Sequence, residues 1–159
     1  MKNIFLTLLI LCITASYGLC STMNSYDSYG RKTGCYRTNG STTTSYDSYG
    51  RRTETIRETS SGYNTYDSYG RKTSTVRKTS TGYTRYDSYG RKTSTVRKTS
   101  TGYTRYDSLG RRTETYRTQS NGTTNIYDKY GHRTGSYKKD SNGRITKYDV
   151  YGRRVGSYR

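Results

Sequence analysis

Arginines and lysines recur beside tyrosines along much of the chain, and such residues can bind a negatively charged polymer. The stretch YDSYGRKTSTVRKTSTGYTR runs from Tyr66 to Arg85 and is repeated letter for letter from Tyr86 to Arg105. Each copy contains five cationic side chains and three tyrosines. Cationic side chains form strong, charge-assisted hydrogen bonds with phosphate and carboxylate groups. Their regular columns predict contact with lipopolysaccharide, teichoic acid, acidic glycans or extracellular nucleic acid. The candidate polyanion-binding residues are Arg71, Lys72, Arg77, Lys78, Arg85, Arg91, Lys92, Arg97, Lys98 and Arg105.

Catalytic side chains are scarce by comparison. His132 is the single histidine and holds the place that Arg71 has in its own unit, which predicts a solvated residue beside a turn. Seven of the eight aspartates recur once per unit in a turn, where aspartate is favoured for its local hydrogen bonding. Glu54, Glu58 and Glu114 do not pair with another acid at a catalytic spacing. The sequence contains no metal-ligand cluster, nucleophile elbow or phosphate loop. We therefore expect a protein that is not an enzyme, uses no cofactor or metal and has no small-molecule substrate.

Net charge and the shortage of aliphatic residues set limits on the fold. The 159 residues carry a formal charge of +18. Low hydrophobicity with high charge is typical of disordered chains. The sequence nevertheless has no proline, which disordered chains favour, and it has 21 tyrosines. We therefore expect a folded chain without a thick aliphatic core. Beyond residue 19 its aliphatic residues are Ile56, Val76, Val96, Leu109, Ile126, Ile145, Val150 and Val155.

Residues 1–18 have the pattern of a secretory signal peptide. Lys2 precedes an apolar run from Ile4 to Ile13, and Ser16 and Gly18 have the spacing of a signal-peptidase site. A membrane-spanning helix needs roughly 20 apolar residues, so this run is too short for one. The pattern predicts cleavage after Gly18, no membrane span afterwards, and a secreted, periplasmic or cell-surface protein.

The cysteines give two alternatives that depend on this cleavage. Cys20 and Cys35 could form a disulfide in an oxidising compartment if cleavage follows Gly18. If cleavage follows Cys20 instead, Cys35 is a lone thiol. The sequence leaves both alternatives open.

A short motif, Tyr-Asp-x-x-Gly, recurs at intervals of 20 or 21 residues. A fixed period of this length is typical of repeat proteins whose units rest on their neighbours. We expect a lead-in over residues 19–25 and one repeat domain over residues 26–159, with six full units and one partial unit. The motif tyrosines are Tyr26, Tyr46, Tyr66, Tyr86, Tyr106, Tyr127 and Tyr148, and the motif glycines are Gly30, Gly50, Gly70, Gly90, Gly110, Gly131 and Gly152.

Each unit contains two turn signals separated by residues typical of strands. The segment from Asp67 to Gly70 has Asp first and Gly fourth, as a type I turn prefers. The second signal is Ser80-Thr81-Gly82, which becomes Ser120-Asn121-Gly122 in a later unit. Residues rich in Thr, Val, Tyr and Ile lie between the turns. We therefore expect an all-β fold of tandem β-hairpins, about two strands per unit, arranged as a meander or a solenoid-like elongated sheet. Whether the sheet is flat, coiled or closed is left open.

Strand alternation predicts which side chains share a face and which are buried. Lys72, Ser74 and Val76 are expected together on one face. Each unit is expected to bury the residue at the Val76 position, the motif tyrosine and the turn tyrosine at the Tyr69 position. Stacked tyrosines would then replace an aliphatic core.

Two Asn-Gly sequences match both a turn signal and the N-glycosylation pattern. They are Asn39-Gly40-Ser41 and Asn121-Gly122-Thr123. We favour the turn interpretation, because it needs no assumption about the organism.

The unit Tyr-Asp-x-x-Gly-Arg, followed about ten residues later by a glycine-centred turn, resembles the YD repeat of rearrangement-hotspot (RHS) and teneurin-like proteins. The resemblance covers nearly the whole chain after the signal, although the sixth copy has His132 in place of arginine. It implies a β-hairpin meander of secreted or extracellular proteins concerned with carbohydrate binding, surface contact or enclosure of toxin cargo. Family members that form a closed shell are far longer, so the resemblance implies only a strip or partial wrap here. The matching segments are 26–31, 46–51, 66–71, 86–91, 106–111 and 148–153.

The sequence therefore favours an exported, non-enzymatic repeat protein that is a structural or adhesive element at the cell surface or in the extracellular space. The alternative is a basic module that binds polyanions or cell-surface glycans. Self-association is left open.

Overall fold

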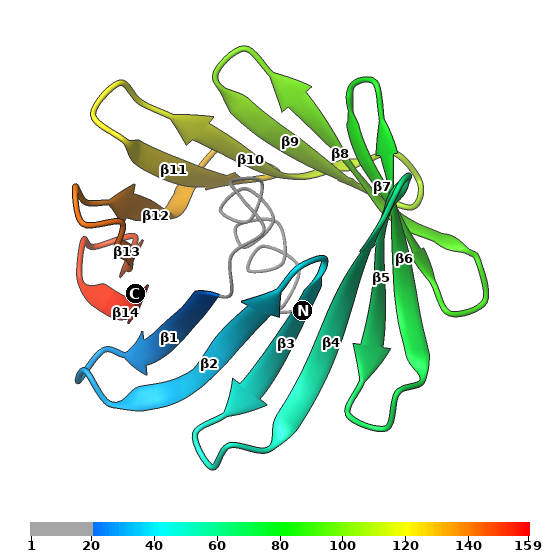
Figure 1. Cartoon of the computed structure of the whole chain (residues 1–159). Helices are drawn as coiled ribbons and strands as arrows, with labels where there is room; N and C mark the ends of the chain where they lie inside the picture. Colours follow the sequence, from blue (N-terminus) through cyan, green and yellow to red (C-terminus); the bar gives the residue numbers. More distant parts are fainter. Residues whose placement is uncertain (1–20) are drawn as a thin grey trace.

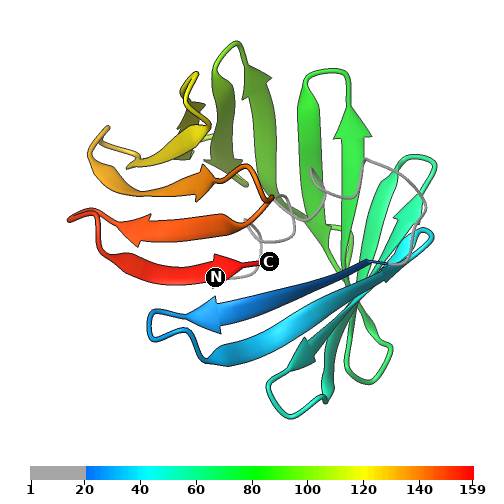
Figure 2. The ribbon, with the colours of Figure 1, turned by 60° about the vertical axis from the view of Figure 1, so that its left-hand side comes forward.

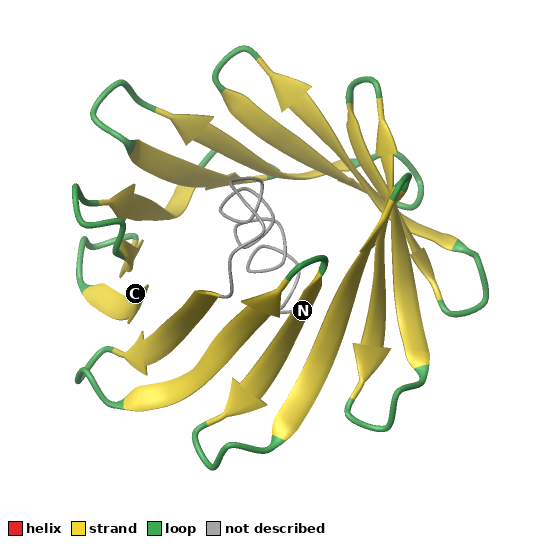
Figure 3. Cartoon of the chain, in the orientation of Figure 1, coloured by secondary structure: helices red, strands yellow, loops and turns green. Residues whose placement is uncertain are grey.

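The structure, a computed structural model, describes residues 21–159, which form fourteen antiparallel β-strands and no helix (Figures 1 and 3). This confirms the expected all-β fold of hairpins. The strands are β1 (Ser21–Asp27), β2 (Lys32–Asn39), β3 (Thr42–Asp47), β4 (Arg52–Thr59), β5 (Gly62–Asp67), β6 (Lys72–Thr79), β7 (Gly82–Asp87), β8 (Lys92–Thr99), β9 (Gly102–Asp107), β10 (Arg112–Thr118), β11 (Thr123–Asp128), β12 (Arg133–Lys139), β13 (Ile145–Asp149) and β14 (Arg154–Tyr158).

The sheet closes into a barrel, because its first and last strands pair with each other. Tyr26 on β1 lies opposite Ser157 on β14. Just beyond this pair, Asn24 N–H donates to Arg159 O at 2.6 Å, and Arg159 N–H donates to Asn24 O at 3.0 Å. Figure 2 shows β1 and β14 side by side at this seam.

The expected elongated or solenoid-like sheet, and the partial wrap implied by the resemblance, were therefore wrong. Strands twist in a right-handed sense, and β-bulges increase that twist and bend the sheet. Each repeat contains one such register shift. Between β5 and β6, for example, Thr65 lies opposite Ser74 but Tyr66 lies opposite Lys72. The repeated bend brings the two ends of the sheet together and removes both exposed edges.

The bulge also changes which side chains share a face. Directly opposite residues of an antiparallel pair lie on the same face. Lys72 therefore shares the face of Tyr66, while Ser74 shares that of Thr65. The prediction that Lys72 lies with Ser74 and Val76 was wrong, because simple alternation does not count the extra residue of a bulge.

The turns at the two ends of the barrel differ in chemistry. Turns after odd-numbered strands contain the Asp, Tyr, Gly and Arg of the motif, and we call this end the tyrosine rim. It consists of residues 27–31, 47–51, 67–71, 87–91, 107–111, 128–132 and 149–153. Turns after even-numbered strands are mostly Ser, Thr, Asn and Gly, and we call this end the serine rim. It consists of residues 40–41, 60–61, 80–81, 100–101, 119–122 and 140–144.

The change of period from 20 to 21 residues arises at the serine rim. Residues 60–61 alone join β4 to β5, whereas residues 119–122 join β10 to β11. Asn121 Oδ1 accepts the N–H of Thr123 at 3.0 Å and so closes the wider turn. Asn39 is the last residue of β2. Both Asn-Gly sequences thus lie at serine-rim turns, as expected.

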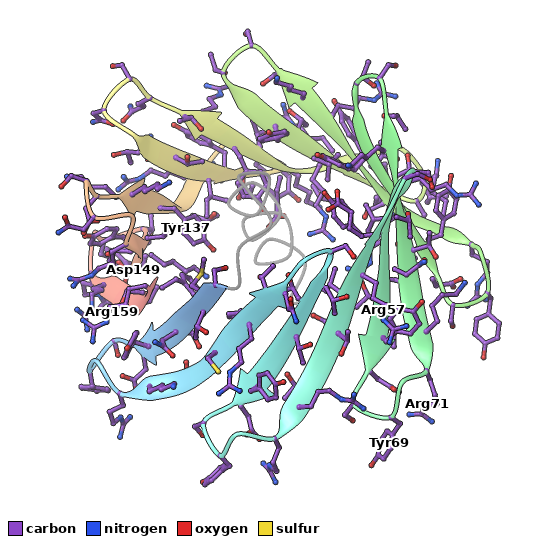
Figure 4. The ribbon with its side chains drawn as sticks, in the orientation of Figure 1. Arg57, Tyr69, Arg71, Tyr137, Asp149 and Arg159 are labelled. Atoms are coloured by element: carbon purple, nitrogen blue, oxygen red, sulfur yellow. The ribbon has the colours of Figure 1, made fainter. Side chains whose placement is uncertain are left out.

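The two faces of the closed sheet form an inner and an outer wall. The inner wall carries the residues at the Val76 position. Figure 4 shows Tyr137 on the side of β12 that faces the barrel interior and Arg159 on the outer side of the wall. Ile56, Val96 and Tyr137 are 4%, 7% and 8% exposed. Burial at this position is therefore confirmed for these residues.

The predicted burial of the turn tyrosines was wrong. Tyr69 is 81% exposed, because the third residue of a tight turn projects beyond the sheet. The motif tyrosines, such as Tyr46 and Tyr66, are half-buried on the outer wall. The barrel therefore packs two tyrosines per unit at most and presents the third to solvent.

Candidate binding surface at the tyrosine rim

Each turn of the tyrosine rim is held by one aspartate. Asp67 Oδ1 accepts the N–H groups of Tyr69 and Arg71, both at 2.9 Å. Asp67 Oδ2 accepts Nε of Arg71 at 2.7 Å. Gly70 has a φ of 81°, and its N–H donates to Asp67 O at 3.1 Å. A type I turn followed by a left-handed glycine is a common hairpin connection, and it explains the Asp-x-x-Gly spacing.

This turn presents a tyrosine and an arginine together. The Arg71 guanidinium carbon lies 5.2 Å from the centre of the Tyr69 ring, within the range of a cation–π contact. The Arg71 side chain is 75% exposed, although its Nε is bound to Asp67. Figure 4 shows both side chains projecting from the end of the β5–β6 hairpin. The same contact recurs at Tyr29 with Arg31, Tyr49 with Arg51, Tyr89 with Arg91 and Tyr151 with Arg153.

Two turns of the rim depart from this pattern. Leu109 replaces the tyrosine of the fifth unit and is 74% exposed. His132 replaces the arginine of the sixth unit, and its Nδ1 lies 3.4 Å from Asp128 Oδ2. In that turn the Lys129 ammonium lies 4.7 Å from the centre of the Tyr130 ring. The sixth turn therefore keeps a cation beside its tyrosine, supplied from a different position.

Arginines at the start of several even-numbered strands join neighbouring turns. Arg52 donates to Ser68 O at 2.6 Å, and Arg133 donates to Val150 O at 2.9 Å. Arg112 donates to Lys129 O in the same way. Arg154 donates to Ser28 O at 3.1 Å and so crosses the seam between β14 and β1. These contacts join neighbouring turns at four places on the rim, including the seam, while the aspartate of each turn fixes its own tyrosine–arginine pair.

The charges of the rim residues balance, and the first residue of each following strand makes this end of the barrel positive. Hydrogen bonds from the backbone N–H and side chain of Arg111 hold the pKa of Asp107 below its ordinary value, so this carboxylate is ionised near neutral pH. Within the third unit, Asp67 offsets Arg71, and Lys72 adds a further positive charge. Most units follow this scheme, so the end of the barrel is basic and aromatic.

A second set of arginine–tyrosine contacts covers the outer wall. The Arg57 guanidinium carbon lies 5.0 Å from the centre of the Tyr66 ring on the neighbouring strand, and Figure 4 shows Arg57 on the outside of the barrel. Cationic side chains here cover the half-buried motif tyrosines, which gives them a packing role. Equivalent pairs are Arg37 with Tyr46, Arg77 with Tyr86, Arg97 with Tyr106, Arg117 with Tyr127 and Arg159 with Tyr26.

The structure does not bring the ten predicted polyanion-binding residues onto one surface. Arg71 and Arg91 belong to the tyrosine rim, and Lys72 and Lys92 begin the strands that follow it. Arg77 and Arg97 lie on the outer wall. The other four are on the inner wall: Arg85, Arg105, Lys78 and Lys98.

Three of the four inner-wall members of this set, Arg85, Arg105 and Lys78, have local partners. Arg85 donates to Ser74 Oγ at 3.1 Å. Arg105 forms an ion pair of 3.2 Å with Glu114, and Lys78 forms one of 3.3 Å with Glu58. The sequence did not show that these side chains face inward while other cations of the same units face outward. The bulge and the closure of the sheet together decide which residues face inward.

Sequence reasoning missed the exposed turn tyrosines as binding residues. It placed them in the core, although their place as the third residue of a four-residue turn could have indicated exposure. The arginine that follows each turn glycine was recognised at Arg71 and Arg91 only. Its equivalents Arg31, Arg51, Arg111 and Arg153 were not, and the sixth turn has His132 at this place.

Several predictions concern residues outside the described part of the chain. The signal peptide of residues 1–18, its cleavage site and Cys20 lie there, so the predicted disulfide is untested. Cys35 is buried on β2 and is bonded to no other cysteine among residues 21–159. No helix among residues 21–159 is long and apolar enough to cross a membrane. Within the same residues, no group of three His, Cys, Asp or Glu side chains is arranged to hold a metal ion.

No protein-family model matches the chain, and no curated protein is significantly similar to it. The resemblance to YD-repeat proteins therefore stays a prediction, which depends on the motif and its period.

Proposed function

We propose that this protein is an exported adhesive element that binds acidic glycans through the tyrosine rim. The observation that carries the proposal is the ring of exposed tyrosine–arginine pairs, each fixed by an aspartate. Tyr69 and Arg71 show the arrangement: an 81% exposed ring beside a 75% exposed guanidinium. The aspartate bond orients the arginine, so less conformational entropy is lost when an anionic group binds.

The number of pairs favours a polymer as the partner. One exposed arginine contributes little affinity in water, because solvent and salt screen its charge. Several identical contacts on one rigid ring raise the effective concentration of each further contact. A glycan with regularly spaced carboxylate or sulfate groups can use several pairs at once. The serine rim lacks such pairs, so we expect binding at one end of the barrel.

The experiment compares the rim with the outer wall at equal charge. The rim variant carries Arg51→Gln, Arg71→Gln and Arg91→Gln. The control variant carries Arg57→Gln, Arg77→Gln and Arg97→Gln, which removes the same charge from the same units. Retention of the full chain on immobilised heparin, a sulfated glycan, is measured as the salt concentration needed for elution.

The rim variant is expected to elute at clearly lower salt than the control variant, with both measured below their own thermal transitions. Equal losses would show that binding depends on net charge alone and would contradict the proposal. Failure of the unmodified chain to bind heparin would also contradict it. Preference for duplex DNA over heparin at equal salt would identify nucleic acid as the partner instead, with log affinity falling about 0.9 per phosphate contact as log salt rises.

A further inference from the structure

The barrel interior contains a cavity that is lined by residues of its first six strands and of β14. Its volume is about 490 Å³, within the usual range for small-molecule sites. Tyr36, Ile56 and Tyr158 supply aromatic and aliphatic surface, and Ser45 and Glu54 supply polar groups. These residues come from β2, β3, β4 and β14, so the cavity exists only because the seam brings β14 beside β1.

Two polar side chains of this cavity lack hydrogen-bond partners. Ser45 is 7% exposed, and its Oγ is buried with no partner. Glu54 makes no hydrogen bond or ion pair with any other residue in the described part of the chain. Desolvation by burial raises the pKa of Glu54, and the charge of Arg85 on β7 offsets part of this shift. Buried polar groups are nearly always satisfied in folded proteins, so the Ser45 Oγ is available to a ligand. The half-buried Glu54 carboxylate beside it can accept a further hydrogen bond or ion pair.

The charges around the cavity select the kind of partner. Its lining includes Asp47, Glu54 and Asp67 but no lysine or arginine. Asp47 and Asp67 already accept hydrogen bonds from Arg51 and Arg71, which leaves Glu54 as the unpaired carboxylate. The cavity therefore presents a negative charge in a chain whose formal net charge is +18.

The tyrosines of the cavity suit a cation as well. Burial raises the pKa of both Tyr36 and Tyr158 above the ordinary value for tyrosine, so their phenols stay neutral. Neutral aromatic rings attract an ammonium group placed over their faces, most strongly where water is excluded. A neutral sugar would add no positive charge beside Glu54, which Arg85 compensates only in part.

We propose that this cavity binds a small organic cation, a primary amine or a quaternary ammonium compound, with Glu54 as its counter-ion and Tyr36 and Tyr158 beside it. The Ser45 hydroxyl then hydrogen bonds to a polar group of the ligand. This site differs from the tyrosine rim, because it attracts charges of the opposite sign and opens on the inner wall, although Asp47 and Asp67 belong to both.

Calorimetric titration of the full chain with choline tests the proposal. The control ligand is 3,3-dimethylbutan-1-ol, which has the shape of choline but carries a carbon in place of the charged nitrogen. The test variant is Glu54→Gln, and the control variant is Glu58→Gln. Glu58 lies on the same strand, but it pairs with Lys78 and is not part of the cavity lining.

Choline is expected to bind at least about tenfold more tightly than the neutral alcohol. Glu54→Gln should remove this preference, while Glu58→Gln should keep it. Absence of choline binding, or equal binding of the two ligands, would overturn the proposal, and this comparison needs no variant. Retention of the preference in a folded Glu54→Gln protein would overturn the role of Glu54. Binding of methyl glucoside in place of choline would identify a sugar site and would also overturn the proposal.

Discussion

Closure of the barrel predicts that a disulfide can join β1 directly to β14. Asn24 and Arg159 exchange two backbone hydrogen bonds, of 2.6 and 3.0 Å. Residues paired in this way have Cα atoms about 5.5 Å apart, inside the roughly 4.4–6.8 Å that disulfides span. The test protein therefore carries Asn24→Cys and Arg159→Cys. Its native cysteines are replaced by serine, because Cys35 lies opposite Asn24 on β2 and would compete.

The expected stabilisation follows from the length of chain that the disulfide encloses. A loop from residue 24 to residue 159 loses unfolded-state entropy worth about 5 kcal/mol in the chain-entropy model. The matched control is Arg77→Cys with Thr84→Cys, which are opposite residues at the same place in an internal hairpin. Its loop is short, so the same model gives about 2.5 kcal/mol. Each protein loses one arginine–tyrosine contact, so that effect cancels.

Circular dichroism measures the thermal midpoint of unfolding for the oxidised and the reduced form of each protein. At about 2–4 °C per kcal/mol for a chain of this size, oxidation should raise the midpoint of the seam variant roughly 5–10 °C more than that of the control. Thiol titration confirms that each disulfide has formed. Free thiols in the oxidised seam variant, beside complete bonding in the control, would show that the sheet is open and would refute the closed barrel.

Two further predictions concern the turns. Gly82→Ala should destabilise the barrel more than Gly90→Ala. Both glycines have a positive φ, 154° at Gly82 and 80° at Gly90. A Cβ added at Gly82 would lie 2.0 Å from Val96 O, whereas a Cβ added at Gly90 would have no atom within 4 Å. We expect Gly90→Ala to lower the free energy of unfolding by about 1–2 kcal/mol, because alanine disfavours this backbone conformation. Gly82→Ala should lower it by roughly 1–3 kcal/mol more, because its Cβ would also clash. Chemical unfolding measures both values, and equal losses would show that β7 and β8 are not so close. Acid should also destabilise the barrel, because the Arg91 backbone N–H donates to Asp87 and lowers the pKa of this carboxyl. A carboxyl whose pKa is lower in the folded state contributes stability above its unfolded pKa of about 3.9 and loses it as pH falls through the folded value. The thermal midpoint should therefore fall below about pH 4, and Asp87→Asn should weaken that dependence; an unchanged midpoint at pH 3 would contradict the role of these carboxylates.

The candidate surface was only partly predictable. The Asp-x-x-Gly spacing indicated the turns, because hydrogen bonds within five residues determine their geometry. Arg71 and Arg91 were recognised because cationic residues recur in regular columns beside the tyrosines. Tyr69 was placed in the core, since a polar chain with few aliphatic residues suggested that every tyrosine was needed for packing. Its exposure is compatible with folding because the inner wall uses a different residue of each unit, such as Ile56 or Tyr137.

Local pattern alone determined that this chain alternates strands and tight turns with a period of 20 or 21 residues. Turn preference and strand propensity depend on neighbours in sequence, so they can be read without the fold. The tertiary structure alone decided that the sheet closes, that Glu54 and Tyr158 share a cavity, and that Arg85 faces inward while Arg77 faces outward. Those outcomes depend on twist and bulges that accumulate over fourteen strands, so the sequence of one repeat does not determine them.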